Sequence, residues 1–442
     1  MTNVIRTRGR AVLFGSVLGS LVLAAALASP SSSATVRAPA VTGVTATQIT
    51  LGTTTPLTGP AAPGYDEIAP ATNAVFKYIN AHGGVYGRKI KYIIDNDGYN
   101  PTNTVSLTKQ LVEQQNIFAD VGPLGTPTQL AVQGFLNSRG VPQLFVESGC
   151  ACWSQSKFPD SFGWQPNYIV EGKLLGHFVD DHLGRKKVGY LYQNDEFGLD
   201  GVKGLNEEIP SKNVVGSQNY DGTSAGLAAG LGAQISALKA DGATLVVLYT
   251  IPAATALALL AAAGLDYHPV WVVSSVGSDP PTLAALLGSF SKGKAGASLL
   301  NGMITNAYAP PESQSSDAWI KLAKSILSKY EKGYHWDGNS EYGVGLGITM
   351  VELLEAAGKN LTRSGLLKTL ETVGKTFATP GLVPLTYSKT DHYGYSGSEM
   401  VRIAGGGASI TPVSPLYVTT NTGPIKIYKG APKKIPALFT KS

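Results

Sequence analysis

Ile49-Thr-Leu-Gly-Thr-Thr-Thr-Pro-Leu-Thr-Gly59 begins the stretch of sequence, ending at Val146, that decides the fold. Within it, short apolar segments alternate with amphipathic helical segments, and polar Gly-rich loops join them. Two of these loops are Asn80-Ala-His-Gly-Gly-Val-Tyr-Gly-Arg88 and Val121-Gly-Pro-Leu-Gly-Thr126. Strand, loop, helix and strand in repeated order form a parallel sheet with crossover helices. We therefore predict an α/β fold whose loops are placed to bind a small molecule.

The same rhythm predicts two units of similar build. The predicted strands of these units are Ile49–Thr54, Lys89–Ile94, Phe118–Val121, Val141–Val146, Val188–Tyr192, Thr244–Tyr249 and Val270–Val273. Apolar residues at helical spacing predict helices at Ala69–Ala81, from Asn100 onward, Thr126–Ser138, Gly198–Ile209 and Pro252–Ala263. A mainly helical portion, Trp319–Lys375, comes next. Short strands are predicted beyond it, at Leu382–Tyr387, Val401–Ile403 and Tyr417–Thr419.

The composition is that of a globular protein of two or three domains. The chain has 442 residues, of which 43% are apolar and 15% charged, and this is enough for sizeable cores. The formal net charge is +5, and removing the first 34 residues, which carry three arginines and no acids, lowers it to +2. A charge this small, without a stripe of Lys and Arg, does not indicate nucleic-acid binding.

The first 34 residues have the order of a secretory signal peptide. Arg6, Arg8 and Arg10 precede an apolar run from Ala11 to Ala28, and small residues follow it. A retained membrane anchor is the alternative, but Gly and Ser interrupt the run, which is at the short edge for a membrane span. No Cys follows the run, so the bacterial lipid-attachment site is missing. We expect cleavage after residues 1–34, a flexible leader at residues 35–45, and export to the periplasm or cell exterior.

The two cysteines, Cys150 and Cys152, are separated by a single alanine. In an exported protein such a pair can oxidise, which favours a structural disulfide. Free thiols and a metal or redox site are the alternatives. No further Cys and no nearby His completes a metal site, so we predict no bound metal.

Three motifs that elsewhere mark catalysis or cofactor binding have structural explanations here. Gly222-Thr-Ser-Ala-Gly226 fits the serine hydrolase pattern, but polar residues precede it where an apolar strand is needed, and Asp221 or Thr223 is predicted to cap a helix instead. Gly343-Val-Gly-Leu-Gly347 lies in a helical pattern and is predicted to allow close helix packing. Asp95-Asn-Asp97 lacks the rest of a calcium loop. We therefore predict neither enzyme activity nor a cofactor.

Two loops indicate a binding site at one edge of the first predicted sheet. Val121-Gly-Pro-Leu-Gly-Thr-Pro-Thr128 follows a buried strand and begins a helix, which leaves backbone N–H groups free for a ligand carboxylate, with the Thr126 or Thr128 hydroxyl assisting. A simple helix cap by the same threonine is the alternative. A second polar loop, Glu147-Ser-Gly149, ends the neighbouring strand. Ligands of open parallel sheets bind beyond the carboxyl ends of the strands, so the two loops support each other.

A series of motifs in a specific order gives a resemblance to a known family. The motifs are Pro56-Leu-Thr-Gly59, Ile79-Asn-Ala-His-Gly-Gly84, Gly87-Arg-Lys89, Asp97-Gly-Tyr-Asn-Pro101, Val121-Gly-Pro123, Gly140-Val-Pro142 and Asn194-Asp-Glu-Phe-Gly198. Over roughly Ile49–His392 the chain resembles the Leu/Ile/Val-binding-like, type I periplasmic-binding proteins, which are substrate-binding proteins of bacterial ABC transporters.

The resemblance implies two Rossmann-like lobes with parallel central sheets, joined by a three-strand hinge and closing on a ligand between them. Lobe 1 would comprise residues 46–167 and 304–379, and lobe 2 residues 168–303 and 380–442. Carried over position by position, the resemblance assigns the ligand carboxylate to Thr126. The other expected ligand-binding residues are Tyr65, Ser148, Gly149, Phe197, Thr250 and Ser275.

One segment departs from the family pattern. Amino-acid-binding members commonly have an acid just past the strand that matches Val270–Val273, but here Ser274-Ser-Val-Gly-Ser278 follows and the first acid is Asp279. A buried ammonium without a paired charge is costly, so an amine-free carboxylate, an amide or an aromatic compound fits as well as an amino acid. Trp153 and Trp164 either stack on the ligand or fill a lobe surface or the hinge.

The function implied is that of an exported, monomeric solute-binding protein that closes over a small, carboxylate-bearing ligand and presents it to an ABC permease. The alternative is a ligand-sensing module of the same fold that feeds a signalling receptor or kinase. No second membrane segment or signalling domain is seen in the sequence, which favours transport.

Overall fold

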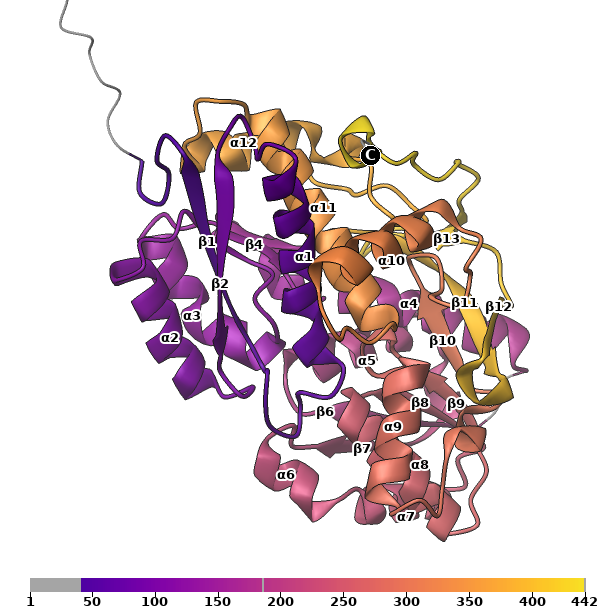
Figure 1. The fold of residues 1–442 in the computed structure, drawn as a ribbon. Helices are drawn as coiled ribbons and strands as arrows, with labels where there is room; N and C mark the ends of the chain where they lie inside the picture. The colour runs from indigo at the N-terminus through magenta and orange to yellow at the C-terminus, as the bar shows by residue number, and fades with distance from the viewer. Residues whose placement is uncertain (1–40, 185–186, 441–442) are drawn as a thin grey trace, which may run out of the picture. The chain divides into compact units, whose positions relative to one another are not determined.

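The computed structural model describes residues 41–184 and 187–440, which form two β-sheets flanked by helices (Figure 1). Residues 40–442 belong to one compact unit. The predicted signal peptide and the first part of the predicted leader lie outside the described residues. Within the described ranges, no helix has the length and apolar character needed to cross a membrane.

The first sheet is entirely parallel, as predicted. Its strand order is β2-β1-β3-β4-β5, and the strands are β1 (Gln48–Thr55), β2 (Lys89–Asn96), β3 (Ala119–Val121), β4 (Gln143–Val146) and β5 (Ser161–Gly163). Figure 1 shows α2 (Pro101–Glu113) and α3 (Thr126–Ser138) on one side of β1 and β2, and α1 (Ile68–Ala81) on the other. Helices on both faces explain why β1 is buried along nearly its whole length. We call this sheet and its helices the first lobe.

The second sheet has a parallel core and an antiparallel edge. The strand order is β14-β13-β11-β10-β9-β8-β6-β7, with β12 also paired to β11. The parallel strands are β6 (Val188–Gln193), β7 (Val214–Tyr220), β8 (Leu245–Tyr249), β9 (Val270–Val273) and β10 (Ile304–Ala307). The antiparallel ones are β11 (Gly397–Ala404), β12 (Ser409–Pro412), β13 (Tyr417–Val418) and β14 (Lys426–Ile427).

Six helices accompany this second sheet, and together they form the second lobe. They are α4 (Tyr168–His182), α5 (Glu196–Glu208), α6 (Ser224–Ala229), α7 (Gly232–Ala240), α8 (Pro252–Gly264) and α9 (Pro280–Phe290). A separate buried apolar cluster lies in each lobe.

The helical portion after β10 returns to the first lobe. It comprises α10 (Ala318–Tyr330), α11 (Gly338–Ala357) and α12 (Arg363–Val373), and Figure 1 shows α11 beside α1. A Cβ on Gly343 would lie 2.3 Å from the carbonyl oxygen of Ile68, and one on Gly347 would lie 2.9 Å from Val75 Cβ. The prediction that this Gly-rich run allows close helix packing is therefore confirmed.

Within the described residues, three segments connect the lobes up to β11, and the residues after β14 return to the first lobe. The first runs from β5 to α4, the second from β10 to α10, and the third from α12 to β11. This connectivity is that of two doubly wound α/β lobes joined by three crossovers, which confirms the predicted fold class. The predicted residue limits of the lobes stay a prediction.

Some predicted elements are wrong or were missed. The predicted strand Leu382–Tyr387 forms only an isolated bridge between Leu385 and Tyr395, because Pro384 has no N–H to donate to a ladder. Helix α4 was not predicted, although Asn167 caps it by accepting from the Val170 N–H. Strand β7 was missed because its residues are polar, as suits an edge strand. A strand therefore does precede Gly222, but Thr223 caps α6 as predicted.

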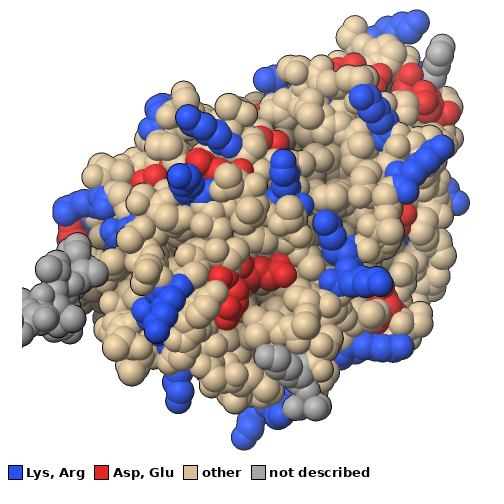
Figure 2. All heavy atoms as spheres, turned by 90° about the horizontal axis from the view of Figure 1, so that it is seen from above, with Lys and Arg blue, Asp and Glu red and all other residues tan. Residues whose placement is uncertain are grey.

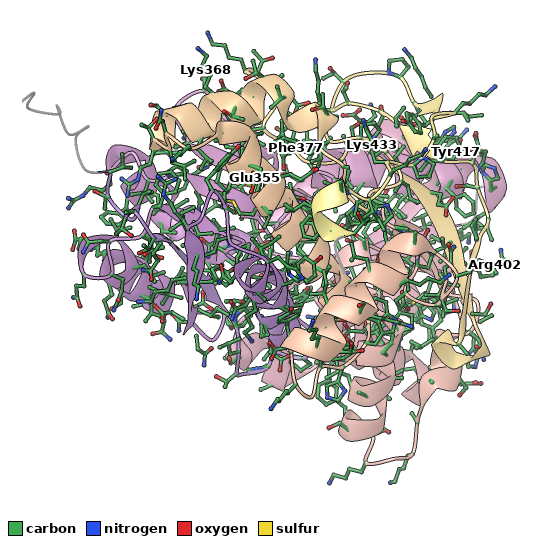
Figure 3. All side chains as sticks on the ribbon, turned by 45° about the horizontal axis from the view of Figure 1, so that its top comes forward. Glu355, Lys368, Phe377, Arg402, Tyr417 and Lys433 are labelled. Carbon is green, nitrogen blue, oxygen red and sulfur yellow. A yellow bond between two sulfur atoms is a disulfide. The ribbon has the colours of Figure 1, made fainter. Side chains whose placement is uncertain are left out.

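The last described residues pack against the first lobe. The indole N–H of Trp319 donates to the carbonyl oxygen of Lys433 (3.1 Å), and the ring of Phe439 stacks on Tyr78 with centroids 5.9 Å apart. Figure 3 labels Lys433 and Phe377 in this part of the molecule. The chain thus returns to α1 and α10 after completing the second sheet.

The charged surface agrees with the weak net charge. On the face seen in Figure 2, Lys and Arg side chains lie singly or in small groups among uncharged residues, and they form no continuous stripe. This face gives no sign of a nucleic-acid-binding surface.

Candidate functional site

A cavity lies between the two lobes, with an empty volume of about 1210 Å³ that includes its solvent-open mouth. Its walls come from the loops and helix starts at the carboxyl ends of the parallel strands in both lobes, where ligands of such sheets bind. All three connecting segments also contribute, through Trp164 and Gln165 from the first, residues 308–312 from the second and Pro380 from the third. The cavity therefore has two opposed walls and a side formed by the connections.

Four of the seven residues expected from the sequence line this cavity: Tyr65, Thr126, Phe197 and Ser275. Tyr65, in a short 3-10 helix at Tyr65–Glu67, donates its hydroxyl to the carbonyl oxygen of Val276 in the opposite lobe (3.1 Å). Phe197 lies at the start of α5, after the capping residue Asp195, and its ring lies 4.6 Å from that of Tyr168. These aromatic side chains give each lobe an apolar wall.

The other three expected residues do not line the cavity. The Ser148 hydroxyl is buried behind Thr126 and shares a 2.7 Å hydrogen bond with the Thr126 hydroxyl. A Cβ on Gly149 would lie 2.4 Å from the carbonyl oxygen of Pro166, so Gly149 allows a close backbone approach. Thr250 is fully buried and shares a 2.6 Å hydrogen bond with Thr255. Ser148 can orient Thr126, whereas Gly149 and Thr250 serve packing in this conformation.

The start of α3 supplies a polar end to the cavity. Gly125 caps the helix with a φ of 106°, a left-handed conformation that favours glycine, and it lines the cavity together with Thr126. The Thr128 hydroxyl donates to the carbonyl oxygen of Leu124, so its proton is not directed at a ligand. The first N–H groups of a helix carry a partial positive charge, so this end suits an anionic oxygen.

Ser275 is engaged by a residue that sequence reasoning missed. Glu171, on α4, is fully buried and accepts hydrogen bonds from the Ser275 hydroxyl (2.7 Å), the Ser275 N–H (2.8 Å) and the Ser274 hydroxyl (3.0 Å). Burial raises the pKa of Glu171, and these hydrogen bonds oppose the rise. Glu171 therefore holds the loop after β9 in place. No sequence pattern marked Glu171, which is one of several charged residues on α4.

Acidic residues form a second part of the site that the sequence did not reveal. Glu147, Asp279, Glu312 and Glu341 line the cavity, and none of its described lining residues is Lys, Arg or His. Burial raises the pKa of all four, that of Glu312 to about 7. Within the described ranges, no group of three or more His, Cys, Asp or Glu residues is arranged to hold a metal ion.

Several hydrogen bonds join the lobes around the cavity. Asp279 caps α9 by accepting from the Thr282 N–H (2.9 Å), and its other oxygen accepts from the Gly338 N–H at the start of α11 (2.9 Å). The Ala151 N–H of the first lobe donates to Asp200 of the second (2.8 Å). Asp279 is the first acid after β9 in the sequence. It lines the cavity and bridges the starts of α9 and α11. These hydrogen bonds link the two lobes across the cavity.

The disulfide and the two tryptophans lie in the segment that leads to the first connection. Cys150 and Cys152 are disulfide-bonded, and they form a small buried cluster with Val146 and Trp153. Trp153 does not line the cavity. Trp164 does, and its indole N–H donates to the Thr349 hydroxyl (2.9 Å). Of the two tryptophans, only Trp164 is placed to contact a ligand.

Two α/β lobes joined by three connections enclose a cavity at the carboxyl ends of their parallel strands. The chain belongs to the periplasmic binding protein family, whose model matches residues 48–408. Members of this family are solute-binding proteins of the periplasm rather than enzymes.

Individual relatives are distant. An amino acid binding protein from Pseudomonas aeruginosa is 22% identical over 201 residues, which are 45% of this chain and 52% of that protein. The matched region spans about half the length of the curated relatives.

Solved structures are similar over most of the chain. A fatty acid ABC transporter substrate-binding protein from Thermomonospora curvata has a TM-score of 0.70 and 22% identity, with 86% of this chain and 95% of that chain covered. A branched chain amino acid ABC transporter from Thermus thermophilus with bound valine has a TM-score of 0.70 and 18% identity, with 85% and 98% covered. At these identities the likeness shows the fold alone.

Proposed function

We propose that this protein is exported and captures a small, carboxylate-bearing organic solute between its lobes for delivery to an ABC permease. The observation that carries the proposal is that residues lining the cavity also join the lobes across it. Tyr65 reaches Val276, and Asp279 reaches the N–H of Gly338. A solute that contacts both walls favours the closed state over the open one, which is how such proteins report occupancy.

The polar end at α3 supports a carboxylate on the solute. Thr126 lies in the first turn of the helix and lines the cavity. Its hydroxyl is held by Ser148 at 2.7 Å, so it is oriented before a solute arrives, which lowers the entropy lost on binding. Delivery to a permease is supported by the similarity to substrate-binding proteins of ABC transporters.

A ligand screen tests the proposal directly. The purified protein is heated with amino acids, amides, aliphatic carboxylates and aromatic acids, and unfolding is followed by thermal shift. A solute at 100 times its dissociation constant adds about 2.7 kcal/mol to the free energy of unfolding. We expect at least one carboxylate-bearing compound to raise the melting temperature. If no compound does so, the capture of such a solute is contradicted.

Two tyrosine substitutions distinguish a hydrogen bond between the lobes from one within a single lobe. Tyr65→Phe removes a hydroxyl that bonds across the cavity, whereas Tyr267→Phe removes one that bonds to the Ala243 carbonyl oxygen within the second lobe (2.7 Å). A hydrogen bond contributes about 1 kcal/mol, so Tyr65→Phe is expected to weaken solute binding about fivefold, measured by calorimetry. Tyr267→Phe is expected to leave affinity unchanged. Equal effects of the two variants would remove the role given to Tyr65.

A further inference from the structure

The charged groups that line the cavity are all of one sign. Four carboxylic acids and no basic side chain are among its described lining residues. Two more acids, Asp337 and Glu67, lie beside them. Asp337 is 3% exposed and caps α11. Burial and the charges of Asp337, Asp66 and Asp279 raise the pKa of Glu67 to about 8. Closing a solute over these groups buries them further. Buried charges of one sign are costly unless an opposite charge pairs with them.

The four lining acids differ in what already binds them. Both oxygens of Asp279 accept backbone hydrogen bonds. Glu341, in the first turn of α11, is 6% exposed, and its Oε1 atom has no hydrogen-bond partner. Glu312 lies on the second connection, close enough for its charge to raise the pKa of Glu341. Glu341 is therefore a buried, unpartnered acceptor that lines the cavity, with a second carboxylate beside it.

Aromatic rings lie next to this acidic pair. Trp164, Tyr308 and Tyr342 all line the cavity, and the ring centroid of Trp164 lies 4.7 Å from that of Tyr342 and 6.4 Å from that of Tyr308. Tyr342 follows Glu341 in the chain, and the charge of Glu341 raises the pKa of Tyr308. Aromatic faces beside carboxylates attract organic cations through the negative face of the ring.

We infer that the captured solute carries an organic cationic group, a protonated amine, guanidinium or quaternary ammonium, held by Glu341 and Glu312 against the rings of Trp164, Tyr308 and Tyr342. The inference rests on the proposed function and adds to it the charge class of the solute.

Without a bound cation, protons can neutralise the acids of the cavity. Burial and the charges of Asp279 and Asp337 raise the pKa of Glu312 to about 7, so its carboxyl is partly protonated near neutral pH. A solute cation beside Glu312 and Glu341 replaces that proton and pairs with both carboxylates. Binding then removes the repulsion among the acids that line this corner.

Matched pairs of compounds test the charge class by calorimetry on the full exported protein at pH 7.5. 4-Guanidinobutanoate is compared with 4-ureidobutanoate, 6-aminohexanoate with hexanoate, and choline with 3,3-dimethylbutan-1-ol. In each pair only the first member carries a positive charge. We expect at least one of these cationic members to bind at least about tenfold more tightly than the partner that lacks the positive charge. If neutral or purely anionic compounds bind as tightly as every cationic one, the inference is overturned while the proposed capture of a solute stands.

Substitutions test whether Glu341 and Glu312 hold the cationic group of the solute. Glu341→Gln and Glu312→Gln keep the shape of the side chain, and each is expected to lower the affinity for the cationic compound at least about tenfold. Glu399→Gln is the matched control, because Glu399 on β11 is half-buried with a raised pKa and does not line the cavity. If one cavity variant does not fold, the other still decides.

Affinity retained in both cavity variants overturns the inference. If nothing in these pairs or in the earlier screen binds, the proposed function fails together with it.

Discussion

The two ends of the cavity are built on opposite principles. At the start of α3, Thr126 and the buried Ser148 present hydroxyl groups and free helix N–H groups, and these favour negative charge. At the other end, Glu312 and Glu341 present carboxylates beside aromatic rings, and these favour positive charge. The comparison teaches that the backbone fold provides the groups that favour negative charge at the α3 end, whereas side chains provide the groups that favour positive charge at the other end. Helix starts recur in every lobe of this kind, whereas the acids come from segments far apart in the sequence.

The largest expected effect is at the hydroxyl end. Thr126→Ala combined with Ser148→Ala removes the oriented hydroxyl pair, and we expect at least about a hundredfold loss of solute affinity without unfolding. Thr250→Ala combined with Thr255→Ala removes a similar buried pair, 2.6 Å apart, that does not line the cavity. Calorimetry on both double variants, with circular dichroism as a check on folding, distinguishes them. Unchanged affinity in the first variant would remove the assignment of this end.

The acidic end is expected to make stability depend on pH. In the folded protein, burial and neighbouring acids raise the pKa of Glu312 to about 7 and that of Glu67 to about 8, well above the ordinary value of about 4.3. Between pH 6.5 and pH 8.5 the folded state therefore holds protons that the unfolded state has released, so the free energy of unfolding falls as pH rises. We expect the melting temperature of the ligand-free protein to fall by on the order of 3 °C across this range.

The Glu312→Gln variant serves as the check on that pH dependence. It removes one of the groups that titrate in this range, so its melting temperature is expected to fall less steeply between pH 6.5 and pH 8.5. A pH profile identical to that of the unaltered protein would show that Glu312 does not hold a proton in the folded state.

The smallest expected effect concerns Glu147, an acid that lines the cavity but is not one of the two assigned to the cationic group. Neither carboxylate oxygen of Glu147 has a hydrogen-bond partner, and one would lie 3.1 Å from a Cβ on Gly122, beside Leu346. Burial raises the pKa of Glu147. Glu147→Gln is expected to change the affinity for a cationic solute by less than about threefold. A loss as large as that of Glu341→Gln would extend the cationic site to Glu147.

The sequence predicted the parts of the molecule that depend on local order. Thr126 could be found because a buried strand, a Gly-containing loop and a helix follow one another directly, and the helix was placed correctly at Thr126–Ser138. Tyr65, Phe197 and Ser275 were found through the family resemblance and line the cavity. Polar edge strand β7 was missed because an exposed strand does not need alternating apolar residues.

The acidic end could not be predicted because no local pattern contains it. Glu312 lies in a connection without regular structure, and Glu341 lies in a helix that packs on the first lobe. Only the return of the chain between the lobes brings them together. Gly149 and Thr250 illustrate the reverse case: the family resemblance predicts that they line the site, yet here they serve backbone packing and a buried hydroxyl pair.

The three connections contribute to the wall of the cavity itself, through Trp164, Tyr308 and Pro380. Under the proposed function, a solute rests against the segments that join the lobes. The length and bulk of the solute would then limit how closely the two lobes can approach each other. A membrane partner that contacts both lobes would then detect the size of the solute through the angle between the lobes. It would not need to contact the solute.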